Sequence, residues 1–188
     1  MLKKLLLLTL FFLAFMLNFY TLVHGDEKSE ESTKSARITI NYQLAYPGIL
    51  PDHPLYKIKR LRDKITPYFI GDVNKKIDYY LLQTDKGILA SQMLIEKNKI
   101  DLALDTALKA ENNMTIITQV IKANKSKVAK DKFKKLETAS LKHQEILNLI
   151  LTKVKNDKKK PFVDVLYFSK KNLEEIKNTL FPAKKVTY

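Results

Sequence analysis

Residues 100–121 read IDLALDTALKAENNMTIITQVI, a stretch in which small and apolar side chains recur at alternating steps of three and four residues. Side chains with this spacing stand on one face of an α-helix. The stretch therefore predicts a long helix with one continuous apolar seam. Its members are Ile100, Ala103, Ala107, Ala110, Met114, Ile117 and Ile121.

Two neighbouring stretches share this spacing and predict two further long helices. An isolated helix of this length is only marginally stable in water, so the seams must bury one another. The links near residues 98–99 and 123–126 are short, which favours antiparallel neighbours along the chain. We expect an all-α antiparallel bundle. The upstream seam carries Ile77, Leu81, Thr84, Ile88, Ser91 and Ile95, and the downstream seam Ala129, Phe133, Leu136, Ser140, His143, Leu147, Ile150 and Val154.

Two more helices flank the three long ones. The proline-rich segment 47–54 holds the chain in turns, so a short helix begins only after it and runs to about residue 66. Asp72 is a candidate N-cap for the next helix. After Pro161, which we expect to close the third long helix, a last amphipathic helix runs to Pro182. Its apolar face holds Phe162, Val165, Leu166, Ser169, Leu173, Ile176 and Leu180.

The N-terminus has the features of an export signal. Lys3 and Lys4 precede an almost unbroken apolar run over residues 5–23. The run is long for a cleaved signal peptide and slightly short for a membrane span, so residues 1–25 are a signal peptide or a signal anchor, and both readings stay open. In either case the positive-inside rule places the rest of the chain outside the cytoplasm. We expect a secreted protein, or one tethered to the outer face of the cytoplasmic membrane.

The remaining chain divides by composition. Residues 26–42 form a flexible tether, since 26–37 hold almost no apolar side chain, and residues 38–42 suit an extended arm lying on the domain. Residues 43–182 form the helical domain, and residues 183–188 a frayed tail. The membrane is then contacted only through residues 1–25, if these are uncleaved.

Catalytic and metal motifs are missing from the sequence. The chain has no cysteine, which excludes disulfides, thiolate metal sites and thiol nucleophiles. It also has no nucleophile elbow, phosphate-binding glycine loop, His-Glu-x-x-His motif or calcium loop. We expect a noncatalytic protein without metal or cofactor.

The formal charge of +14 comes from 34 basic residues, of which all but three are lysine. Scarce arginine, the export signal and the absence of an aromatic stacking platform argue against nucleic acid. An anionic lipid, an envelope polymer or an acidic protein is the candidate partner, and a general preference for lysine is the alternative explanation. The oligomeric state is not readable from the sequence. The candidate contacts are Lys125, Lys127, Lys130, Lys134 and Lys135.

One histidine stands on a predicted seam. His143 lies between Ser140 and Leu147, where a titratable ring could make the packing respond to mild acid. It is the candidate pH-responsive residue of the core. The alternative is a buried histidine held by an ordinary hydrogen bond.

Several blocks of sequence resemble a known family. The opening motif is YPGILPDHPLY over residues 46–56, followed by KRLRDKI over residues 59–65. Later blocks are YYLL at 79–82 with Asp85-Lys86, KAEN at 109–112 and KHQEIL at 142–147. Together they resemble the bacterial exported domain-of-unknown-function family 5667 over about residues 43–155. The resemblance implies an exported helical domain and brings no catalytic or ligand residues.

These observations favour an exported, noncatalytic helical domain that binds or scaffolds in the cell envelope. A single-pass, membrane-anchored sensor or regulator with the same outer domain is the alternative. An envelope enzyme is the less favoured third class.

Overall fold

The computed structural model describes residues 40–182, and within this range every regular element is helical. The predicted all-α class is therefore confirmed. The predictions for residues 1–25, 26–39 and 183–188 lie outside the described residues. None of the described helices has the length and apolar character needed to cross a membrane. The elements are α2 (Tyr56–Ile65), the 3-10 turn η1 (Thr66–Phe69), α3 (Val73–Glu96), α4 (Ile100–Ala123), the 3-10 turn η2 (Lys125–Lys127), α5 (Lys132–Lys153) and α6 (Asn156–Leu180).

Local signals set both ends of α3. The Asp72 carboxylate accepts a hydrogen bond from the Lys75 backbone N–H at 2.8 Å, so the predicted N-cap of α3 is confirmed. At the other end of α3, Asn98 takes the left-handed conformation with φ of 57°. Asparagine tolerates this conformation better than most residues, which lets the chain reverse into α4 without a glycine.

Pro161 does not separate two helices, and the expected boundary there is wrong. Helix α5 ends at Lys153, and α6 begins at Asn156 and includes the proline. Because Pro161 stands near the start of α6, where backbone N–H groups are only beginning to find partners, its missing N–H removes a single early hydrogen bond.

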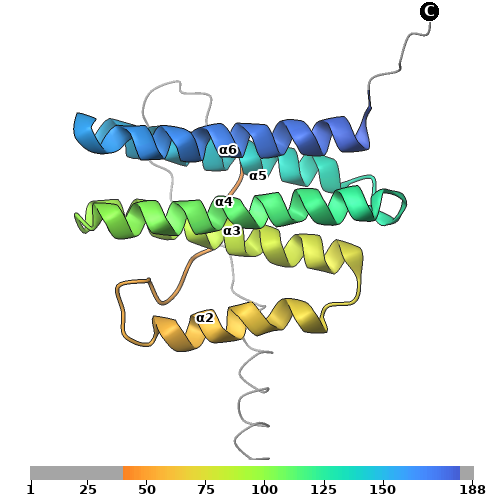
Figure 1. The fold of residues 1–188 in the computed structure, drawn as a ribbon, viewed down its shortest axis with the longest axis horizontal. Helices are drawn as coiled ribbons and strands as arrows, with labels where there is room; N and C mark the ends of the chain where they lie inside the picture. The colour runs from red at the N-terminus through yellow and green to blue at the C-terminus, as the bar shows by residue number, and fades with distance from the viewer. Residues whose placement is uncertain (1–39, 183–188) are drawn as a thin grey trace, which may run out of the picture. The chain divides into compact units, whose positions relative to one another are not determined.

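Two antiparallel hairpins stack on each other, one made of α3 and α4 and the other of α5 and α6 (Figure 1). Helices α3 and α5 lie side by side and run in the same direction. Near their starts the Lys132 ammonium lies 2.6 Å from the Asp78 carboxylate. Near their ends the Lys153 ammonium lies 3.4 Å from the Glu96 carboxylate.

Helices α4 and α6 are paired in the same parallel way. Lys158 contacts Asp101 at 2.9 Å near their starts, and Lys122 contacts Glu175 at 2.7 Å near their ends. Helix α4 thus packs on α3 and α6, and α5 packs on α3 and α6. The expectation that all consecutive helices are neighbours holds within each hairpin but not between α4 and α5. The link over residues 124–131 joins these two diagonal helices across the start of α3, where the Asn74 amide donates to the Lys127 carbonyl and accepts from the Ala129 backbone N–H, both at 2.9 Å.

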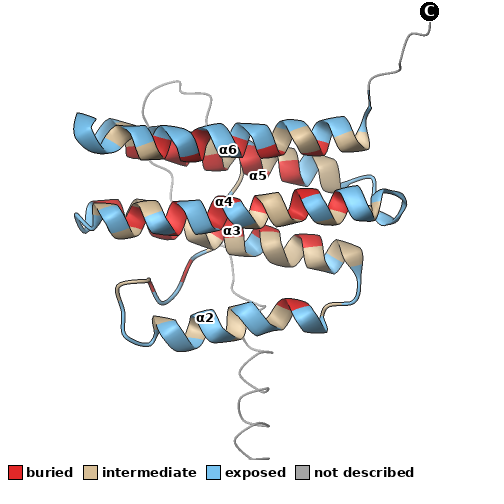
Figure 2. Cartoon of the chain, in the orientation of Figure 1, coloured by how far each residue is buried: buried red, intermediate tan, exposed pale blue. Residues whose placement is uncertain are grey.

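The predicted seams form the core (Figure 2). Every member of the α3 seam is buried, and so is every member of the α4 seam after Ile100. In the downstream seam only Ala129, in the link before α5, and Phe133, in the first turn of α5, are not buried. Helix α6 closes the core with Phe162, Val165 and Ile176, all fully buried. The four helices therefore bury their apolar faces on one another.

An extended arm lies on this bundle, as expected for residues 40–42. The Ile40 backbone N–H donates to the Glu145 carboxylate at 3.2 Å, and the Leu44 side chain is buried. The arm thereby places Tyr42 beside α3.

Helices α3 and α4 are in close contact at Gly87. A Cβ atom added there would lie 2.6 Å from the Ala110 Cβ on α4. Real Cβ atoms do not approach so closely, so the helices would have to move apart. Gly87 is therefore required by packing, although glycine weakens a helix interior.

Gly87→Ala should destabilise the protein by about 1 kcal/mol. Overpacking costs roughly 1–3 kcal/mol and outweighs the helix-propensity gain of about 0.5–1 kcal/mol. Combining it with Ala110→Gly removes the clash and should restore stability close to that of the wild type. Urea unfolding of both single variants and the double variant measures the coupling.

Gly71→Ala is the matched control, because nothing lies within 4 Å of a Cβ built there. This variant should be neutral or slightly stabilising. Additive effects of Gly87→Ala and Ala110→Gly would contradict the proposed close contact.

Candidate functional site

A histidine and a carboxylate form a hydrogen bond in the middle of the bundle. The ring of His143 on α5 is fully buried, and its Nε2 lies 2.6 Å from Oδ1 of Asp85 on α3. The Tyr42 hydroxyl donates to the other oxygen of Asp85 at 2.7 Å. An ionised carboxylate only accepts, so Nε2 carries the shared hydrogen when Asp85 is charged. The extended arm thus closes the outer side of the pair.

A second carboxyl group, from Glu111 on α4, is buried beside this pair with 3% of its surface exposed. Within residues 40–182, neither carboxyl oxygen of Glu111, nor Nδ1 of His143, nor the Ser169 hydroxyl has a hydrogen-bond partner. The Asn172 amide from α6 donates to the Glu111 backbone carbonyl at 3.3 Å. All four long helices therefore contribute polar groups to one buried cluster, which we define as Asp85, Glu111, His143, Ser169 and Asn172.

Burial raises the pKa of two groups of this region, Glu111 and Tyr42. It raises the pKa of Glu111, and the nearby His143 ring and the Ser169 and Asn172 side chains offset only part of this effect. The pKa of the Tyr42 hydroxyl is raised as well. Burial is the largest cause, and the neighbouring Asp85 carboxylate is the second. Burial therefore favours the protonated forms of Glu111 and Tyr42.

No group of three or more His, Cys, Asp or Glu side chains in residues 40–182 is arranged to hold a metal ion. The buried position of His143 agrees with its place on the predicted seam. Its response to pH stays a prediction.

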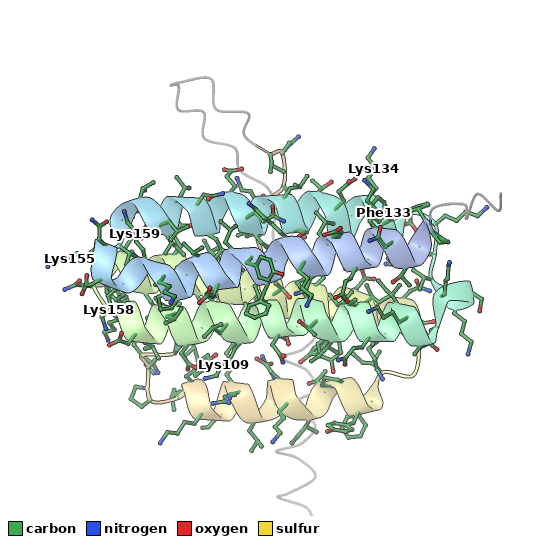
Figure 3. All side chains as sticks on the ribbon, turned by 45° about the horizontal axis from the view of Figure 1, so that its top comes forward. Lys109, Phe133, Lys134, Lys155, Lys158 and Lys159 are labelled. Atoms are coloured by element: carbon green, nitrogen blue, oxygen red, sulfur yellow. The ribbon has the colours of Figure 1, made fainter. Side chains whose placement is uncertain are left out.

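The five candidate lysines all lie at one end of the bundle and are exposed. Lys125 and Lys127 belong to η2, Lys130 lies in the link that follows, and Lys134 and Lys135 lie in the first turn of α5. The Lys134 side chain points away from the ribbon (Figure 3). We call these five residues the lysine-rich end.

Sequence spacing did not reveal Asp85 and Glu111, because a seam is traced through its small and apolar members. A signal was nevertheless present. Asp85, Glu111 and His143 each lie in one of the three later blocks on which the family resemblance rests, and the fold brings the three blocks together.

Comparison with known proteins agrees with this resemblance. The family described as "Domain of unknown function (DUF5667)" matches residues 48–157, more than half of the chain. No curated protein and no solved structure has significant similarity to the chain. The match covers α2 to α5 and includes Asp85, Glu111 and His143.

Glu111→Gln should reduce the pH dependence of stability. The pKa of Glu111 is higher in the folded protein than in the unfolded chain, where it has its usual value of 4.5. Between the two pKa values the folded state binds more protons, so this stabilisation is complete at low pH and is lost as pH rises through the folded pKa. Urea unfolding between pH 5 and pH 8 should show a loss of stability that is smaller in the variant by about 1 kcal/mol or more.

Glu174→Gln, at an exposed glutamate of α6, is the matched control and should keep the wild-type dependence. Equal pH dependence in Glu111→Gln and the wild type would show that Glu111 does not carry this linkage.

Proposed function

We propose that the protein is an exported, noncatalytic binding or scaffolding domain of the cell envelope. We draw this function from the geometry, because the chain belongs to the DUF5667 family and the description of this family names no activity. The lysine-rich end of the protein contacts a polyanion in the cell envelope. The export signal predicted in residues 1–25 supports the location, and the surface charge supports the partner.

One observation carries this proposal: most of the lysine-rich end has no acidic partner. Among the described residues, no carboxylate forms an ion pair with Lys125, Lys127, Lys130 or Lys134. Lys135 shares Asp78 with Lys132. Burial alone would raise the pKa of Asp78, but these two ammonium groups lower it overall. Four exposed cations therefore remain available to an external anion.

Stability does not account for these cations. Lys134 and Lys135 stand in the first turn of α5, where the helix dipole disfavours positive charge by a few tenths of a kcal/mol. Attraction to an anionic surface is worth about 1 kcal/mol per basic residue. Binding to a polyanion therefore explains the cluster better than folding does.

Burial of the polar cluster supports the noncatalytic part of the proposal. Asp85, Glu111 and His143 are 4%, 3% and 0% exposed. A general acid or base must come within hydrogen-bond reach of its substrate. A substrate could reach these groups only if the four helices separated.

Replacing Lys125, Lys127, Lys130 and Lys134 together by glutamate should abolish salt-sensitive retention on purified cell-wall material. Four lost attractions of about 1 kcal/mol each predict a loss of roughly a thousandfold. Retention of the wild type should weaken as salt is added, because these charges are exposed.

The control variant changes Lys160, Lys170, Lys171 and Lys177 of α6 to glutamate, which gives the same net charge at another exposed surface. It should keep most of the retention. Equal losses in both variants would indicate a response to net charge alone, and no loss in either would remove the proposal.

The membrane-anchored sensor or regulator is the second candidate, and the neighbouring buried groups of Glu111 and His143 favour it. Proton exchange there would act directly on the packing of α3, α4 and α5, with Asp85 and Tyr42 as the other titratable groups of the region. This candidate requires that residues 1–25 are retained. The mass of the native protein in membrane fractions tests it, and a mass that lacks these residues rejects it.

A further inference from the structure

Helix α2 lies against the α3–α4 hairpin with its polar side inward. Tyr56, Lys59 and Asp63 face a small cavity of about 50 Å³ that Gly87 also lines. The Lys59 ammonium is held by the Pro47 and Ile49 carbonyl oxygens, at 2.5 and 3.2 Å. These contacts fix the proline-rich loop and the inner side of α2 in place.

The link to α3 is also polar, since the Tyr79 hydroxyl donates to the Asp63 backbone carbonyl at 2.7 Å. No residue of α2 is buried. The orientation of α2 is thus the reverse of that found in an ordinary amphipathic helix of a globular domain, whose apolar face points to the core.

The outer side of α2 and η1 carries a continuous apolar surface that we call the outer stripe. Spacing of three and four residues aligns the α2 members on one face, and two aromatic residues of η1 extend it. Exposed contiguous apolar surface of this kind marks an interaction site in a soluble domain. The members and their exposed fractions are Leu55 51%, Ile58 66%, Leu61 60%, Ile65 45%, Tyr68 84% and Phe69 82%.

Positive charge borders the outer stripe. Lys57, Arg60 and Lys64 are exposed, and helical spacing puts them along one edge of it. The one acidic residue of α2, Asp63, is turned inward and bonded to Arg62 at 2.6 Å. The exposed side of α2 therefore combines apolar side chains with cations and carries no carboxylate.

We propose that the outer stripe binds the surface of an anionic lipid bilayer, with α2 lying in the plane of the interface. Apolar side chains enter the boundary between headgroups and acyl chains, and the cations contact the lipid phosphates. Tyr68 and Phe69 supply the aromatic groups that favour this depth. Ten residues span about 15 Å and hydrocarbon about 30 Å, so α2 lies on the bilayer and does not cross it.

Charge favours a bilayer over a second copy of the chain. An antiparallel pair of outer stripes would bring Lys57, Arg60 and Lys64 of both copies together, and like charges across an interface are costly. In a parallel pair these cations would meet no carboxylate, because the exposed side of α2 carries none. An anionic bilayer satisfies the apolar and the charged parts of the surface at once. This surface is distinct from the lysine-rich end, and the inference does not rest on the proposed function.

The absence of native cysteine allows a site-specific test in the full chain. Single cysteines at Ile58, Ile65 or, as control, Val163 are labelled with a polarity-sensitive fluorophore. Val163 is an exposed apolar residue of α6, 49% exposed. Labels at positions 58 and 65 should shift to the blue and be quenched by bromolipids in vesicles of phosphatidylglycerol and phosphatidylcholine, whereas the label at 163 should not.

Changing Lys57, Arg60 and Lys64 to glutamate tests the charged edge with the label at position 58. Three lost contacts predict binding weaker by about 100-fold on anionic vesicles. The triple variant Lys160→Glu, Lys170→Glu and Lys177→Glu on α6 is the matched control and should bind like the wild type.

Three results would overturn the inference. If vesicles cause no blue shift and no quenching of the labels at positions 58 and 65, the outer stripe does not bind lipid. Labels already shielded without lipid would show that another copy or another part of the chain covers it. An equal shift with pure phosphatidylcholine would show that anionic lipid is not the partner.

Discussion

Mutual burial of four helix seams is the constraint on which the rest of this structure depends. Each of α3, α4, α5 and α6 has one apolar face, and the four faces close on two apolar clusters to which every one of these helices contributes. Once this core is closed, no apolar seam is left for α2, which meets the hairpin through polar contacts. The closure also surrounds Asp85, Glu111 and His143 with protein, so these groups must satisfy one another or remain without a partner.

The sequence was sufficient to predict the helices and their buried faces, because the spacing of apolar residues reports directly which side of a helix avoids water. It did not predict that α4 and α5 lie diagonally, each in contact with α3 and α6 but not packed on the other. Spacing identifies the buried face of each helix and not the helix that this face meets. The helix boundary predicted at Pro161 was wrong for a local reason, since a proline early in a helix is tolerated whereas one in its interior is not.

The polar cluster could be predicted from the sequence only in part. His143 stood on a seam and could be singled out, whereas Asp85 and Glu111 look like the exposed acids of any helix until the fold places them beside the histidine. The same holds for α2, whose apolar spacing normally marks a buried face. Only the three-dimensional arrangement shows that Tyr56, Lys59 and Asp63 take the inner side and that the apolar residues face outward.

The central claim is that α3 to α6 form a closed core and that α2 lies outside it. Hydrogen exchange of the full chain without lipid, followed by mass spectrometry, tests it most directly, since exchange reports the local free energy of opening. Backbone amides of α3 to α6 should exchange slowly and together, and those of α2 much faster. Protection of α2 equal to that of α4 would contradict the account, because the outer stripe would then have to be covered.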